Sequence, residues 1–174
     1  MRLSEVKISS TFKVGGIEFI KFSEEDGVAV AVAKESLFDS TFGKNNDFSK
    51  SEILKDLQSK ILPKLEESIG AENILEFETD LLSLDGSEIY GKMKSRISLP
   101  TFDFYRANVK LFDRYKLSAW WWLSTPDSTR EHTNDNWIVC VSPRGGFYSD
   151  GCDYCDGVRP ILNFVSSISV SCED

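Results

Sequence analysis

The N-terminal part of the chain shows short hydrophobic segments separated by turn signals. Residues 11–14 lead into Gly15 and Gly16, and residues 17–22 alternate in part between apolar and polar side chains. Two such segments around a Gly-Gly pair predict a β-hairpin. Residues 28–33 are apolar throughout, which predicts an interior strand covered on both faces.

One long helix is predicted to follow. Ser49 stands three residues before Glu52, which is the spacing of a capping box. Apolar residues then recur every four positions along one stripe: Ile53, Leu57, Ile61 and Leu65. Pro63 is expected to end or kink this helix, or to begin a second one in its first turn. Gly70 is expected to stop it.

The middle of the chain predicts short elements. Residues 77–84 and 95–99 are strand candidates, residues 102–105 could form one helical turn, and residues 110–116 resemble a polar connection. A single domain over residues 1–174 fits this length.

The C-terminal part has the strongest hydrophobic pattern. Residues 120–123 and 137–141 place apolar groups on both strand faces, so both are expected inside a covered sheet. Residues 124–136 are polar and predict a loop, residues 147–149 follow a hairpin turn, and residues 157–164 predict a closing strand. Together these elements predict an α+β fold with one main helix and a mostly antiparallel sheet of short strands.

Composition narrows the function classes. The chain of 174 residues has a net charge of −8, and 41% of its residues are hydrophobic. That is enough to build a core, while the negative charge argues against nucleic acid and anionic membranes as partners. No run approaches signal-peptide length or the roughly 20 apolar residues of a membrane span. We expect a soluble chain without membrane insertion, although prior removal of a signal stays open. No cofactor is expected, because phosphate-loop and dinucleotide motifs are absent from the sequence.

Three motifs carry a resemblance to a known family. They are Trp120-Trp121-Trp122-Leu123-Ser124-Thr125-Pro126, Val141-Ser142-Pro143-Arg144-Gly145 and Gly157-Val158-Arg159-Pro160. They resemble the signature of an uncharacterised domain family of phages and gut-dwelling Gram-positive bacteria, in which a Trp-Trp-Leu-Arg-Ser-Pro run precedes Val-x-Pro-x-Gly and Gly-Val-Arg-Pro. This sequence departs from the signature at Ser124, where the family usually has arginine.

The resemblance implies a fold and an origin. That family looks like the superfamily of C-type-lectin-like domains and formylglycine-generating enzymes, which includes phage receptor-binding proteins. The fold is therefore expected to be C-type-lectin-like, with a hairpin and helix over residues 1–116 and a signature core over residues 117–174. A phage, prophage or gut-bacterial origin is implied as well.

The four cysteines leave several alternatives open. Cys140, Cys152, Cys155 and Cys172 all lie in the final 35 residues. Free thiols or disulfides are the favoured interpretation, and a metal site is an alternative. The resemblance adds a third alternative, a copper-dependent oxidoreductase that uses the Cys-x-x-Cys pair Cys152 and Cys155.

Other polar residues are expected to be structural or solvated. Asp150, Asp153 and Asp156 recur every three residues, unlike the alternate spacing of an EF-hand loop, and predict a solvated acidic loop. His132 is the only histidine and is expected on the surface. Arg159 is expected to be a buried strut between loops.

The hairpin and loop over residues 142–156 form the predicted recognition site. Tyrosine, serine and glycine predominate there, as in adaptable binding loops. The candidate ligand-binding residues are Arg144, Phe147, Tyr148, Asp150, Asp153 and Tyr154. The hypothesis is a non-enzymatic module that binds a protein or a glycan. The alternatives are the oxidoreductase and a structural component of a larger assembly.

Overall fold

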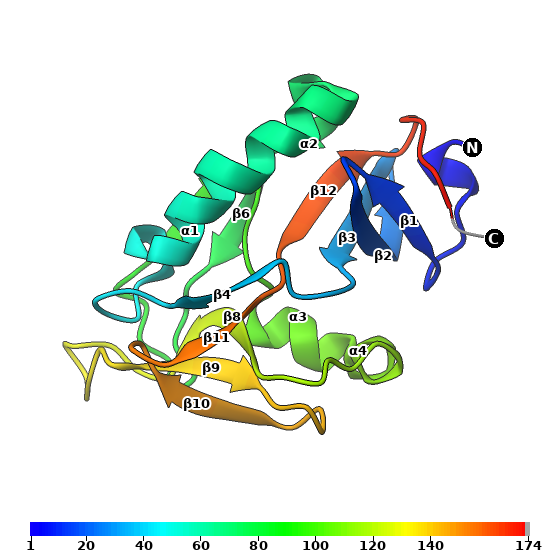
Figure 1. Ribbon diagram of the computed structural model, residues 1–174. Coiled ribbons are helices and arrows are strands. Elements are labelled where there is room, and N and C mark those ends of the chain that lie inside the picture. Colours follow the sequence, from blue (N-terminus) through cyan, green and yellow to red (C-terminus); the bar gives the residue numbers. More distant parts are fainter. Residues whose placement is uncertain (173–174) are drawn as a thin grey trace.

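The computed structural model describes residues 1–172 and contains two five-stranded sheets, a two-stranded sheet and one main helix (Figure 1). The strands of the first sheet, in spatial order, are β1 (Thr11–Val14), β2 (Ile17–Glu25), β3 (Val28–Ala33), β12 (Ile161–Val165) and β5 (Ile74–Leu75). All its pairings are antiparallel. The predicted hairpin is confirmed, and its turn residues Gly15 and Gly16 have φ angles of 57° and 77°, as a tight hairpin turn requires.

The second sheet contains the strands predicted over residues 120–123, 137–141 and 147–149, whereas the closing strand predicted over residues 157–164 is divided between the two sheets. Its order is β10 (Phe147–Gly151), β9 (Trp137–Val141), β8 (Trp121–Pro126), β11 (Cys155–Val158) and β4 (Phe38–Thr41). Only β11 and β8 run parallel. Strands β6 (Phe77–Asp80) and β7 (Lys92–Ser95) form the small third sheet. Strand β4 was not predicted.

The main helix consists of α1 (Glu52–Asp56), a π-helical stretch η3 (Leu57–Ile61) and α2 (Leu62–Ile69). Its N-cap is Ser51, whose hydroxyl accepts the Leu54 N–H at 3.0 Å. The capping box predicted at Ser49 is therefore wrong. Pro63 does not end the helix. It lies in the first turn of α2, directly after the π-helical stretch, as one of the predicted alternatives expected, and a residue without an N–H is tolerated there.

Two hydrophobic clusters cover opposite faces of the sheets. The first lies beneath the main helix and includes Leu57, Leu65 and Trp122. The second includes Phe112 and Trp121. Neighbouring residues of one strand thus enter different clusters, so the inner strands are buried on both faces. This explains the continuous apolar runs of the sequence.

Two short helices cover the second cluster. They are α3 (Phe102–Ala107) and α4 (Val109–Arg114), and both lie beside the sheets in Figure 1. The polar connection predicted over residues 110–116 is wrong, because Phe112 is buried there against Trp121, with ring centres 5.4 Å apart. The single-turn 3-10 helices are η1 (Leu3–Glu5), η2 (Phe48–Lys50) and η4 (Ala71–Asn73).

The N-terminal and C-terminal parts of the chain share both large sheets. Strand β12 lies between β3 and β5, and β4 pairs with β11. Residues 1–116 and 117–172 therefore contribute strands to the same two large sheets. Within residues 1–172, no helix combines the length and the hydrophobicity that crossing a bilayer requires.

Candidate functional site

Strand β10 forms one edge of the second sheet and carries the centre of the predicted recognition site. A tight turn connects it to β9, in which the Ser142 N–H donates to the Gly146 carbonyl at 2.8 Å. From there Phe147 pairs with Val141 and Gly151 pairs with Trp137. Because side chains alternate along a strand, Phe147 and Tyr148 point to opposite faces of this edge.

Exposed aromatic residues gather along this edge. We call them the aromatic edge: Trp120 (37% exposed), Trp137 (43%), Phe147 (50%), Tyr148 (57%) and Tyr154 (58%). Three of them, Phe147, Tyr148 and Tyr154, were predicted as ligand-binding residues. Trp120 and Trp137 were expected to pack in the core, and the structure corrects both. Each of them stands at the end of a buried strand, where one face is no longer covered.

Neighbouring rings support the aromatic edge from within. The Phe147 ring packs on Phe102 of α3 with centres 4.6 Å apart. Tyr148 meets Trp120 edge-on at 5.2 Å. Tyr154 lies over Gly151, where an added Cβ would come within 3.3 Å of its ring. Such contacts fix the orientation of side chains that still face solvent.

The three other predicted ligand-binding residues have different surroundings. Arg144 is exposed in the turn before β10, and Asp153 is exposed in the turn after it. Asp150 is partly buried and points to the same face as Tyr148. There it approaches Cys140, which was not predicted as a neighbour, and Asp156, the third acid of the predicted loop.

Asp150 forms a compact cluster with Cys140 and Asp156. One ligand atom of each lies within 4.8 Å of the others. The expectation that Asp156 is solvated is wrong, because it lies on β11 between β8 and β4 and is 8% exposed. Burial, together with the nearby Asp150 and Asp39, raises the pKa of Asp156 to about 7.

The cysteines do not form disulfides among the described residues. Cys140 and Cys152 are buried, and Cys155 and Cys172 are exposed. Burial, with Asp135 and Asp153 nearby, raises the pKa of Cys152 to about 12. A thiol of this kind stays protonated and is a weak nucleophile at neutral pH.

The signature residues organise the crossing between the two sheets. Trp122 is fully buried and its indole N–H donates to the Ser40 carbonyl at 2.8 Å. Gly157 leaves no space for a side chain, because an added Cβ would lie 2.5 Å from the Ser36 hydroxyl. Pro160 accepts the Ala33 N–H at 2.9 Å. Ser124 is fully buried as well.

Arg159 is fully buried in the same region. Its Nε donates to the Ala33 carbonyl at 2.6 Å and its Nη2 to the Tyr115 carbonyl at 3.2 Å. The guanidinium also lies over the Phe112 ring at 5.4 Å. Burial lowers the pKa of Arg159 to about 10, so the side chain remains a cation at neutral pH.

His132 lies on the surface loop between β8 and β9, with 59% of its side chain exposed. Its Nδ1 is 2.5 Å from Asp85 Oδ2 and 3.4 Å from the Ser128 hydroxyl. In a catalytic triad, the serine and the acid contact different ring nitrogens. Here both contact Nδ1, so this arrangement does not activate Ser128.

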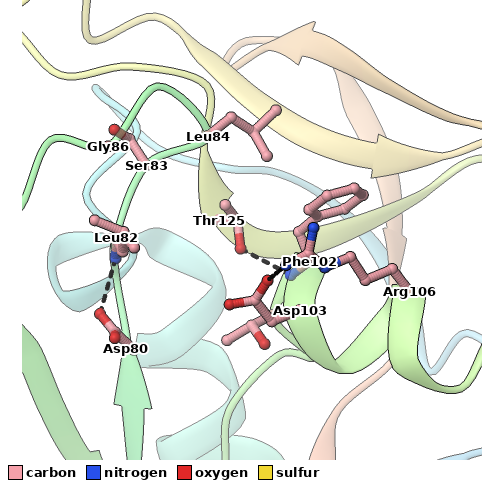
Figure 2. A pocket seen from close by; sticks show the side chains of 10 residues that line it. Asp80, Leu82, Ser83, Leu84, Gly86, Phe102, Asp103, Arg106 and Thr125 are labelled. Atoms are coloured by element: carbon pink, nitrogen blue, oxygen red, sulfur yellow. Dashed lines mark hydrogen bonds and ion pairs between the residues drawn. The ribbon is translucent and has the colours of Figure 1, made fainter.

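A pocket of about 260 Å³ adjoins Phe102 (Figure 2). Asp80, Leu82, Ser83 and Leu84 line one side, and Thr125, Asp103 and Arg106 line the other. Arg106 pairs with Asp103 at 2.9 Å and lies over the Phe102 ring at 5.6 Å. None of these residues was predicted to form a site, because they come from three segments that are distant in the sequence.

Comparisons with known proteins found no relative from which a function could be inferred. No protein-family model matches the chain, and no curated protein and no solved structure is significantly similar to it.

Proposed function

We propose that this protein is a recognition module that binds a partner protein through the aromatic edge. The observation that carries the proposal is the concentration of exposed aromatic side chains on and beside one edge strand. Phe147 and Tyr148 extend from β10 itself, and Tyr154 follows it in the next turn. Aromatic residues are enriched at protein interfaces, where they supply large contact areas with little loss of side-chain entropy.

The position of β10 supports the choice of a protein partner. An edge strand presents backbone N–H and C=O groups that an extended segment of another chain can pair with. Because Phe147 and Tyr148 point to opposite faces, such a segment would contact one ring on each side. The rings are already held by Phe102 and Trp120, which lowers the entropic cost of binding.

Binding is a better account of these residues than catalysis. The raised pKa of Cys152 disfavours a reactive thiolate at the Cys-x-x-Cys pair. His132 does not join a serine and an acid into a triad. The oxidoreductase alternative therefore gains no support from Cys152 or His132.

The C-type-lectin-like fold remains part of this proposal. It is supported by the mostly antiparallel sheets and the single main helix. In such a scheme a rigid core fixes the loops, and exposed loops and edges select the partner.

A glycan is the second candidate ligand, because of the pocket in Figure 2. Its aromatic wall, Phe102, contacts Phe147, and Arg106 and Asp103 offer hydrogen-bonding groups beside it. The volume of about 260 Å³ is slightly below the roughly 300–1,000 Å³ of ordinary ligand pockets. It would therefore accept one small polar unit of a larger ligand.

The test is a pair of screens with the full chain, one against a displayed random-peptide library and one against a glycan array. We expect peptide binders that lose affinity at least about tenfold with the double substitution Phe147→Ala and Tyr148→Ala, as loss of interface anchors predicts. The matched control is Ile89→Ala, which removes an exposed apolar side chain (58%) away from β10.

Three outcomes would count against the protein-partner proposal. Peptide binders with equal affinity for the wild type and the double variant would place recognition elsewhere. Glycan binding that Arg106→Ala abolishes, without any peptide binders, would favour the pocket. The absence of hits in both screens would overturn recognition by this edge.

A further inference from the structure

Three strands bring a thiol and two carboxylates together on one face of the second sheet. Cys140 comes from β9, Asp150 from β10 and Asp156 from β11. One atom of each lies within 4.8 Å of the other two. This spacing is close enough for one ion to contact all three groups after small side-chain movements.

The surroundings leave one carboxylate oxygen of this cluster unsatisfied. Asp156 is 8% exposed, and its Oδ2 is buried without a hydrogen-bond partner. Cys140 is fully buried, and its thiol donates to the Tyr148 carbonyl at 3.5 Å. A buried carboxylate oxygen without a partner is costly. An unpartnered oxygen that belongs to a cluster of ligand groups is the second observation that points to a ligand.

We propose that Cys140, Asp150 and Asp156 bind one Zn²⁺ ion. Zinc accepts thiolate and carboxylate ligands in a tetrahedral arrangement. The thiol disfavours Ca²⁺ and Mg²⁺, which take oxygen ligands. Three protein ligands leave the fourth position to a water molecule, and Asp150, which is only partly buried, gives that side access to solvent.

Zinc binding would also balance the charges of the cluster. Three ionised ligands and one divalent cation have a net charge of −1, compared with −3 for the ionised ligands alone. The thiol proton leaves to solvent when the zinc–sulfur bond forms, and no electron transfer is involved. The ion would tie the edge strand β10, which carries Tyr148, to the inner strands β9 and β11.

The experiment uses the full, reduced chain after treatment with a chelator. Calorimetric titration with Zn²⁺ is expected to show one ion per chain. Titration with Co²⁺ is expected to produce the ultraviolet charge-transfer band of a thiolate–cobalt bond. Cys140→Ser should abolish this band, and Asp156→Asn should weaken Zn²⁺ binding at least about tenfold. The matched controls, Cys155→Ser and Asp153→Asn, alter the exposed neighbours and should change neither result.

Circular dichroism shows whether each variant folds. If a substitution at either buried position prevents folding, Asp150→Asn tests the same site from its partly buried side and should also weaken binding at least about tenfold. Failure of the wild type to bind Zn²⁺ would overturn the proposal. So would binding that Cys155→Ser abolishes, or binding that survives in the folded Asp150→Asn and Asp156→Asn variants.

Discussion

The guanidinium carbon of Arg159 lies 5.0 Å from the centre of the Trp121 ring. This contact joins the chain segment between β11 and β12 to the first residue of β8. Since β11 belongs to the second sheet and β12 to the first, the contact lies where the chain crosses between sheets. Arg159 therefore stabilises the junction on which the aromatic edge depends.

Replacement of Arg159 by Lys is expected to destabilise the fold. Lysine keeps the charge but cannot donate to the Ala33 and Tyr115 carbonyls in the same planar geometry. We expect the free energy of unfolding to fall by about 2–4 kcal/mol, because buried carbonyls and a buried cation lose their partners. Urea denaturation measures this loss. A decrease below about 0.5 kcal/mol, the usual range of surface substitutions, would contradict the strut role.

Substitution of two serines tests which residue caps the start of the main helix. Ser51→Ala removes the hydroxyl that accepts the Leu54 N–H, and loss of an N-cap costs about 1 kcal/mol. Ser49→Ala removes an exposed hydroxyl that donates to Asp47 Oδ1 at 2.6 Å, and we expect a smaller loss. Thermal unfolding of both variants compares them directly. A larger loss for Ser49→Ala would restore the capping box inferred from the sequence.

The sequence predicted the elements whose pattern arises from burial on both faces. Runs such as residues 121–123 and 28–33 have that pattern, because the main helix and α3–α4 cover the two sides of the sheets. Helix α4 was missed because charged residues surround Phe112 and hide a single buried face. The start of the main helix was misplaced because Ser49 and Ser51 are both good capping residues, and only the backbone decides between them.

The proposed recognition residues and the residues of the Cys140 cluster differ in how far the sequence indicates them. Phe147, Tyr148 and Tyr154 were identifiable because aromatic residues in a Gly-rich and Ser-rich hairpin are unusual away from a core. Asp150 and Asp156 look alike in the sequence. Asp156 lies on β11 between β8 and β4, a strand that was not predicted, whereas Asp150 lies on the edge strand β10. Long-range pairing of this kind leaves no local signal.

Asp85 should contribute to stability in a pH-dependent way. Burial acts to raise its pKa, but hydrogen bonds from Ser128, Ser83 and His132 lower it below the usual value. A depressed pKa means that this contribution is present above about pH 4, the usual value for aspartate, and is lost as the pH falls. Asp85→Asn should lower the free energy of unfolding by about 0.5–1 kcal/mol at pH 7. In strong acid it should leave that free energy unchanged.

Urea denaturation across this pH range measures the effect at Asp85. Glu88→Gln, an exposed neighbour, is the control and should leave the stability profile unchanged. If Asp85→Asn lowers the free energy of unfolding equally at every pH, the hydrogen bonds to Asp85 do not favour its ionised form.

Asp156 should show the opposite pH dependence in the metal-free protein. Its pKa in the folded state is about 7, above the value of about 4 for an unfolded chain. Between these values the folded state holds more protons, so stability falls as the pH rises. Asp156→Asn removes the buried charge. We expect the variant to be about 1–3 kcal/mol more stable than the wild type at pH 8, with a flatter profile between pH 4 and pH 8.

Saturating Zn²⁺ should reverse the stability difference between the wild type and Asp156→Asn. A ligand that binds only the folded state stabilises it in proportion to the logarithm of its concentration over the dissociation constant. With saturating Zn²⁺ at pH 8, the wild type should therefore gain more stability than Asp156→Asn, whereas Asp153→Asn should follow the wild type in both conditions. Denaturation with chelator and with zinc measures the two gains. Equal gains in stability for all three proteins would mean that zinc binds away from Asp156. The measurement with chelator would still show how the buried carboxylate of Asp156 affects stability without metal.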